Sequence, residues 1–174
     1  RVVGEGENLK MVDGVLFFKE MTRLIWCTQQ KSGSYIIPDT INAIDSNAFE
    51  SCKKLTSVTI SDSVIEIPKD AFWCCYGLEA VTIPCSVTSI DNYAFSDCTA
   101  LKSISIPDSV TYIGKWAFSD CTALKSISLP DSVKFIDECA FNCCTALISI
   151  SIPDSAISIQ TRAFYGCNAL TSIS

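Results

Sequence analysis

The stretch AFSDCTALKSISIPDSVTYIGKWAFSDCTALKSISLPDSV (residues 94–133) contains nearly the same sequence twice, 23 residues apart. The spacing holds along most of the chain, since an Ala-Phe pair recurs with its phenylalanine at Phe49, Phe72, Phe95, Phe118, Phe141 and Phe164. A leucine follows six residues after each of them. Apolar residues at fixed offsets in a period of roughly 20 to 50 residues indicate a solenoid, whose units bury their apolar faces only against their neighbours.

Each unit predicts one short strand followed by a tight turn. Ile104 and Ile106 alternate with serines before Pro107, so the isoleucines are expected in the core and the serines on the surface. The pair at 108–109, Asp-Ser, favours a chain reversal. In segment 115–121 the apolar residues lie three and four apart, which suggests a single helical or 3₁₀ turn. Stacked units would then form a parallel sheet on one face and short helical turns on the other.

Composition and charge limit the classes of partner. Apolar residues make up 48% of the 174 residues, enough for one continuous core. The net charge of −6 argues against nucleic acid and anionic membranes, which attract basic surfaces. No apolar run approaches the roughly 18 residues of a membrane span, so we expect no membrane insertion. The chain begins at Arg1 without a secretion leader, which indicates a processed protein or an excised domain.

Catalysis and metal binding are not expected. The chain has no histidine and no G-x-S-x-G or phosphate-binding glycine motif, so we predict no enzyme and no cofactor. A zinc site would need paired cysteines or histidines. One column of carboxylates recurs with the repeat, at Asp39, Asp62, Asp108, Asp131 and Asp154. We interpret this column as turn residues, with a calcium-binding ladder as the alternative.

The pattern L-x-x-I-x-I-P-x-S-V-x-x-I-G-x-x-A-F-x-x-C resembles the leucine-rich repeats of the BspA-like, or Treponema pallidum, type. The resemblance covers six units, residues 38–174. It implies an α/β-type, mostly β solenoid: a right-handed arc with a parallel sheet on its concave face and helical or 3₁₀ turns on its convex side. It also implies an extracellular protein used for adhesion, without catalytic residues. The local departures from the pattern are Ser61, Pro68, Cys85, Ala156 and Gln160.

Residues 1–37 do not follow the period, and we interpret them as an irregular N-terminal unit that partly caps the core. Segments 15–18 and 24–27 predict a hairpin. The other end stops at Ser174 without such a cap. We therefore expect that more repeats follow in the full protein, or that this edge associates end to end with another copy.

Six of the eleven cysteines form one structural ladder, three residues after each repeated phenylalanine: Cys52, Cys75, Cys98, Cys121, Cys144 and Cys167. Neighbouring rungs are about 4.8 Å apart, so disulfides between them are geometrically conceivable. Every rung has one cysteine, however, and a buried thiol that fills space is the simpler interpretation. Outside the ladder, Cys139 and Cys143 are four residues apart, and a strained local disulfide is an alternative.

The outward positions of the predicted strands carry almost only serine and threonine, as in the rows that contain Ser103 and Ser105. These rows contain no tryptophan, tyrosine or arginine, the residues that dominate binding hot spots. We expect this face to bind proteins weakly, although a repetitive ligand such as a glycan or ice would suit a regular hydroxyl grid.

Large aromatic residues occur instead at positions that other units fill with polar residues. Tyr93, Trp116, Tyr112 and Phe135 are predicted to line an exposed apolar patch on the convex or lateral surface of the middle units, and Trp73 is a further contact candidate. The alternative is that each aromatic ring only covers its own turn. We expect a non-catalytic cell-surface or secreted module that binds host or microbial surface proteins. A spacer without a specific ligand and a glycan-binding surface are the alternatives.

Overall fold

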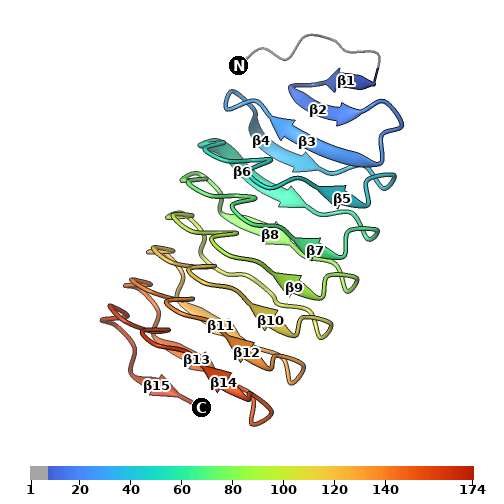
Figure 1. Ribbon diagram of the computed structural model, residues 1–174. Helices are drawn as coiled ribbons and strands as arrows, with labels where there is room; N and C mark the ends of the chain where they lie inside the picture. The colour runs from blue at the N-terminus through green and yellow to red at the C-terminus, as the bar shows by residue number, and fades with distance from the viewer. Residues whose placement is uncertain (1–7) are drawn as a thin grey trace.

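The computed structural model describes residues 8–174, which form a solenoid of stacked rungs with an antiparallel hairpin region at its N-terminal end (Figure 1). Its strands are β1 (Leu9–Val12), β2 (Val15–Phe18), β3 (Arg23–Cys27), β4 (Ser32–Ile36), β5 (Ala43–Ile44), β6 (Lys54–Thr59), β7 (Glu66–Ile67), β8 (Ala80–Thr82), β9 (Ser89–Ile90), β10 (Tyr112–Ile113), β11 (Ser126–Ser128), β12 (Phe135–Ile136), β13 (Ser149–Ser151), β14 (Ser158–Ile159) and β15 (Ser172–Ile173). The later strands recur at the 23-residue spacing of the sequence.

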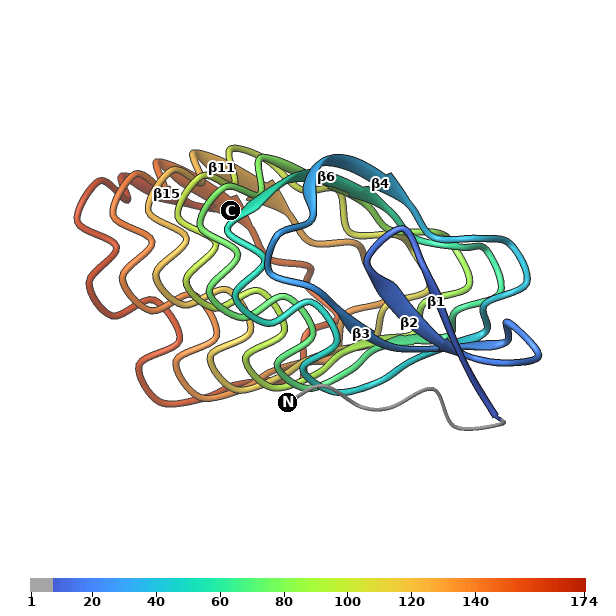
Figure 2. The same ribbon diagram turned by 90° about the horizontal axis from the view of Figure 1, so that it is seen from above.

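The N-terminal region joins the solenoid through a change of strand direction. Strands β1, β2 and β3 pair antiparallel, and β3 then pairs parallel with β5. Viewed from above, β1 to β3 lie across one end of the stacked rungs (Figure 2). The inward side chains of this region, among them Phe17 and Leu24, are buried in the same core as the repeats. Parallel pairing thus begins with β3, and β4 continues it by pairing parallel with β6.

The repeats form two lines of parallel strands where the sequence predicts one. Five of the six units show the expected strand, as β6, β8, β11, β13 and β15 in the sheets β4-β6-β8 and β11-β13-β15, and the second line is the five-stranded sheet β7-β9-β10-β12-β14. Segment 101–107, the unit that predicts the strand most clearly, contains no regular strand. The reason is that the backbone hydrogen bonds to the neighbouring rung are long there, with Lys102 N 3.5 Å from Glu79 O. The rung nevertheless keeps its place, because Ile104 and Ile106 are buried.

A column of stacked phenylalanine rings runs through the core. From Phe49 to Phe164, neighbouring ring centroids are 5.0 to 5.6 Å apart and the ring planes differ by 2 to 12°. Five of the six rings, all but Phe164, are completely buried. Burying a phenylalanine side chain contributes about 1.5–3 kcal/mol, and no single unit encloses its own ring. Each ring of the column is therefore buried by the stacking of neighbouring units.

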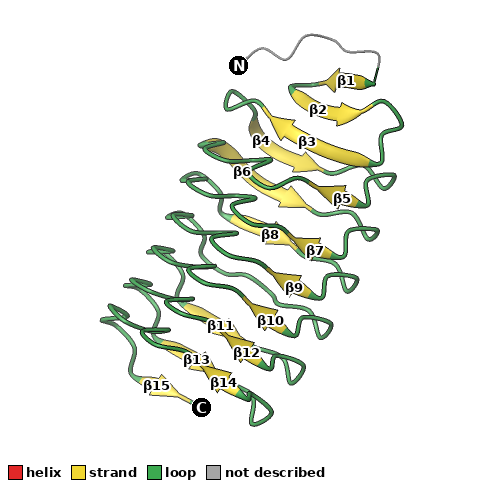
Figure 3. Ribbon diagram, in the orientation of Figure 1, coloured by secondary structure: helices red, strands yellow, loops and turns green. Residues whose placement is uncertain are grey.

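The expected helical turns are absent: between residues 8 and 174 the chain has only strands, turns and bends (Figure 3). Two positions in each unit, two residues before and two residues after the phenylalanine, adopt the left-handed conformation with φ between 55 and 76°. A right-handed helix cannot continue through such residues. The phenylalanine N–H instead donates to the alanine carbonyl of the next rung, at 2.8 Å for Phe95 N to Ala117 O. Bonding between rungs thus replaces helical bonding at this edge.

Candidate functional site

The first candidate site is built on the left-handed position that precedes each phenylalanine by two residues. Asn47 and Asp70 occupy it in the first two units, and such short polar residues adopt this conformation most readily. Tyr93 and Trp116 occupy it in the next two, both with φ of 57°. The left-handed conformation costs most non-glycine residues roughly 1–2 kcal/mol. The fold therefore requires the backbone shape here, but it does not require aromatic side chains.

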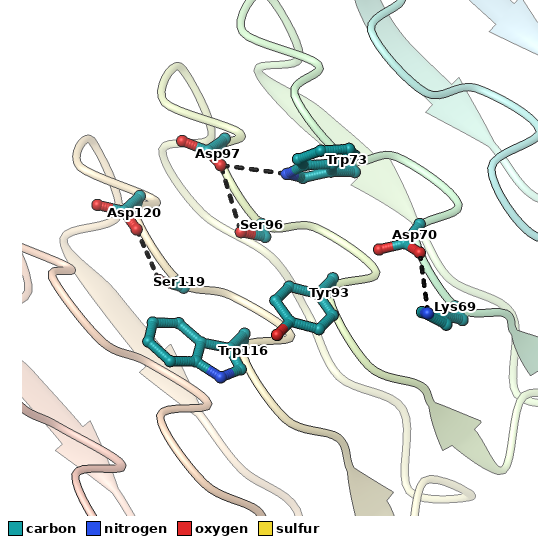
Figure 4. A pocket seen from close by; sticks show the side chains of 9 residues that line it. All are labelled: Lys69, Asp70, Trp73, Tyr93, Ser96, Asp97, Trp116, Ser119 and Asp120. Atoms are coloured by element: carbon teal, nitrogen blue, oxygen red, sulfur yellow. Dashed lines mark hydrogen bonds and ion pairs between the residues drawn. The ribbon is translucent and has the colours of Figure 1, made fainter.

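Tyr93 and Trp116 lie next to each other on adjacent rungs, over a hollow of about 470 Å³. Their ring centroids are 6.2 Å apart and the ring planes differ by only 3°, so the two faces are turned the same way (Figure 4). Trp73 lines the same hollow from the previous rung, and its Nε1 donates to Asp97 Oδ2 at 3.2 Å. We call this site the aromatic hollow. Its lining residues are Lys69, Asp70, Trp73, Tyr93, Ser96, Asp97, Trp116, Ser119 and Asp120.

Acidic groups dominate the charge of the aromatic hollow. Three carboxylates, Asp70, Asp97 and Asp120, face a single lysine, Lys69. The Lys69 ammonium lies 3.6 Å from Asp70, so it is already engaged by one of the three. Partial burial raises the pKa of Asp70, and the neighbouring lysine opposes that shift. Asp97 and Asp120 remain as a pair of carboxylates beside the aromatic faces.

Local hydrogen bonds hold these two carboxylates in place. Oδ2 of Asp97 accepts from Ser96 Oγ at 3.4 Å, in addition to the Trp73 indole. Oδ2 of Asp120 accepts from Ser119 Oγ at 2.6 Å. The main chains of the two rungs are joined by Asp97 N, which donates to Ser119 O at 2.8 Å. Both carboxylates are therefore positioned by the fold before any partner arrives.

Tyr112 and Phe135, the other predicted contact residues, lie in a different hollow. They are direct partners in the parallel pair β10-β12 and line a space of about 210 Å³. Tyr112 Oη donates to Asp137 Oδ2 at 3.0 Å, while Phe135 is 45% exposed. Burial, together with the hydrogen bond to Asp137, raises the pKa of Tyr112 to about 12. No residue lines both hollows, so the four predicted aromatic residues fall into two separate pairs.

The cysteine ladder lies in the core, where each thiol also has a hydrogen-bond acceptor. From the second rung onward the thiol donates to the phenylalanine carbonyl of the preceding rung, at 3.0 Å for Cys75 and 3.3 Å for Cys121. Burial raises the pKa of the Cys98 and Cys121 thiols. All eleven cysteines lie within residues 8–174 and all are free thiols there, including Cys139 and Cys143. Space filling is thus only part of what the ladder provides.

The serine-rich face carries a smaller hollow of about 330 Å³ between β11, β13 and the rungs beside them. Its lining is hydroxyl groups and the edges of core isoleucines: Ser103, Ile104, Ser126, Ile127, Ser128, Ser149, Ile150, Ser151 and Ser174. No charged or aromatic side chain lines it. It therefore offers fewer strong contacts than the aromatic hollow.

In residues 8–174 no group of three or more histidine, cysteine, aspartate or glutamate side chains is arranged to hold a metal ion. The same range contains no helix of the length and hydrophobicity that a membrane crossing needs.

The acidic half of the aromatic hollow was not predicted from the sequence. Asp97 and Asp120 occupy the left-handed position two residues after the phenylalanine, and so they recur exactly one period apart. That shared spacing was the available signal, because residues one period apart lie on adjacent rungs. Trp73 and Tyr93 line the same hollow from adjacent rungs. Their shared site is hard to see in the sequence, because the two residues occupy different positions in the repeat.

The repeats match a known family, and solved structures share the fold. The BspA type leucine rich repeat region matches in six copies, over residues 26–144 and 88–174. The crystal structure of the T. pallidum leucine rich repeat protein is similar, with a TM-score of 0.79, 28% identity, and coverage of 87% of this chain and 72% of that one. No curated protein sequence matches the chain.

Two longer proteins share the same architecture. The pneumococcal vaccine antigen PcpA has a TM-score of 0.76 and 28% identity, with 83% of this chain and 36% of that one covered. A leucine rich cell surface protein from Faecalibacterium prausnitzii has a TM-score of 0.69 and 29% identity, with 98% and 55% covered. The chain thus spans only part of the length of these two proteins. Because the family match extends over residues 26–174, the chain belongs to the BspA-type leucine-rich repeat family.

Proposed function

We propose that this chain is a non-catalytic, extracellular or cell-surface module that binds surface proteins of a host or of other microbes. The observation that carries the proposal is the aromatic hollow, in which Tyr93 and Trp116 replace the asparagine and aspartate of the first units. Aromatic residues beside fixed polar groups are the usual components of protein-binding hot spots. The description of the F. prausnitzii structure as a cell surface protein supports the location.

The test compares the wild-type chain with the double variant Tyr93→Asn/Trp116→Asn. Asparagine occupies the equivalent position at Asn47, so the variant keeps the left-handed turns and the net charge. Both chains are immobilised and exposed to purified surface proteins of epithelial cells and of co-resident bacteria. We expect the wild type to retain a defined protein in a saturable manner, and the double variant to lose it.

A matched control removes an exposed aromatic residue elsewhere. Tyr165 is 65% exposed and lies at a repeat position that holds serine at Ser96 and Ser119, so Tyr165→Ser should fold normally and keep binding. Equal retention by the wild type and the double variant would contradict the proposed site. If the wild type retains nothing saturable, the chain acts as a spacer and the proposed function is wrong.

A further inference from the structure

We propose that the aromatic hollow recognises an arginine side chain of the partner protein, an inference that rests on the proposed function and names the chemistry of its ligand. Three features of the hollow carry the proposal: two ring faces turned the same way, a pair of positioned carboxylates, and a lysine already engaged by another acid. Each feature corresponds to one property of the guanidinium group.

The ring faces match the planarity and charge of a guanidinium. Cations bind over the faces of tryptophan and tyrosine, and arginine does so more often than lysine because its planar group also stacks on the ring. Tyr93 and Trp116 extend over two rungs and their planes differ by only 3°. Two parallel ring faces, one on each rung, are therefore available to a planar cation.

The carboxylates supply the hydrogen-bond acceptors. Asp97 and Asp120 lie in one column on adjacent rungs, which are about 5 Å apart. In both residues the bonds to neighbouring side chains go to Oδ2, and within residues 8–174 Oδ1 accepts no hydrogen bond. The fork of N–H donors on a guanidinium suits such free carboxylate oxygens.

The charge balance selects against other ligand classes. The hollow holds three carboxylates and one lysine, within a chain whose net charge is −6, so an anionic ligand would be repelled. A neutral sugar would stack on the rings and donate hydroxyl hydrogen bonds to the carboxylates, but it would lack the charge attraction that a cation gains. A lysine side chain has the charge but neither the planar surface nor the fork of donors.

The experiment uses three fluorescein-labelled peptides, Gly-Arg-Gly-Arg-Gly and its lysine and citrulline counterparts, titrated with the full chain and followed by fluorescence anisotropy at low ionic strength. We expect the arginine peptide to bind more tightly than the lysine peptide, and the neutral citrulline peptide to show no saturable binding. Equal binding of all three peptides, or tighter binding of the lysine peptide, would overturn the proposal.

Two sets of variants separate the hollow from the general acidity of the chain. Tyr93→Asn/Trp116→Asn leaves the net charge unchanged and should weaken binding of the arginine peptide by about fivefold or more, as expected for the loss of two cation–ring contacts. Asp97→Asn/Asp120→Asn should abolish it. The control Asp108→Asn/Asp131→Asn removes the same number of charges from exposed turn positions and should have little effect. If substitution of either aspartate pair weakens binding equally, the peptide is attracted only by the net negative charge of the chain, and the proposal fails.

Failure of this inference is distinguishable from failure of the proposed function. A surface protein that the wild type retains through the aromatic hollow, but that excess arginine peptide does not displace, would leave the function standing and overturn the arginine assignment. Saturable binding of a neutral oligosaccharide in place of the arginine peptide would also overturn it. Circular dichroism and thermal unfolding of each variant establish that any loss of binding occurs in a folded chain.

Discussion

The phenylalanine column inside the solenoid and the Tyr93–Trp116 pair outside it both consist of near-parallel rings one rung apart. The inner column continues through six consecutive units and is almost wholly buried. The outer pair occupies only two units, at positions where asparagine and aspartate meet the same backbone requirement. Residues that recur in every rung are therefore required by the fold, whereas aromatic residues that interrupt a polar column are not, which makes them candidates for contact with a partner.

The largest effect is expected from breaking the inner column. Phe118 is completely buried between Phe95 and Phe141, so Phe118→Ala should lower the free energy of unfolding by about 3–5 kcal/mol. Equilibrium unfolding in urea measures the change. A loss below about 0.5 kcal/mol, the range of ordinary surface substitutions, would show that stacking between rungs does not hold the core together.

Raising the pH tests the interior through its thiols. Burial raises the pKa of Cys98 and Cys121, whereas an unfolded thiol titrates near pH ~8.5. Their stabilising contribution is therefore complete below about pH 8.5 and is lost as the pH rises toward the folded pKa, by about 1.4 kcal/mol per thiol and pH unit. Urea unfolding midpoints under reducing conditions follow this loss. Cys98→Ala/Cys121→Ala should show a shallower pH dependence, and an unchanged slope would contradict the assignment.

Truncating a single thiol measures what the ladder contributes at neutral pH. Cys121→Ala removes the hydrogen bond to Phe95 O and leaves a small void, so a loss of about 1–2 kcal/mol is expected. Cys85 is exposed, and Cys85→Ala should change the stability by less than about 0.5 kcal/mol. Chemical denaturation of both variants checks the contrast. Equal effects would mean that the buried thiol adds nothing beyond an ordinary surface residue.

The smallest effect is expected at the outer pair. Trp116→Asn removes a ring that the core does not need and installs a residue suited to the left-handed turn, so stability should stay within about 0.5 kcal/mol of wild type. Trp116→Val removes the same ring but disfavours that backbone, and should be less stable than the asparagine variant by about 1 kcal/mol. Because both variants lack the ring, the difference between their melting temperatures measures the cost of the left-handed backbone conformation. Identical melting temperatures would show that the turn is not restrictive.

The 23-residue period predicted the rungs and the buried phenylalanines, because these follow from apolar residues at fixed offsets, and the resemblance of the repeat pattern pointed to the family. The turn was predicted wrongly as helical, because spacings of three and four residues in segment 115–121 suit both a helix and the observed turn. The left-handed positions had a signal of their own, namely Asn47, Asp70, Asp97 and Gly166 at the affected sites. The second line of strands was missed because two-residue strands are too short to show alternation.

The candidate site was predicted only in part. Tyr93, Trp116 and Trp73 do line one hollow, but Tyr112 was grouped with them because it too replaces the polar residues of other units. In the structure Tyr112 belongs to β10, and its neighbour is Phe135 on β12. The hollow that a side chain lines depends on where the chain turns within the unit, and the sequence pattern does not give the positions of those turns.

The left-handed turns have a consequence for how such proteins diversify. Their main chain is hydrogen-bonded to the adjacent rung, so different side chains at the left-handed positions project from the same backbone shape. In this chain the position before the phenylalanine already accommodates Asn47, Trp116, Cys139 and Arg162. Single amino-acid substitutions at these columns thus offer a lineage a way to acquire new ligands while the scaffold stays unaltered.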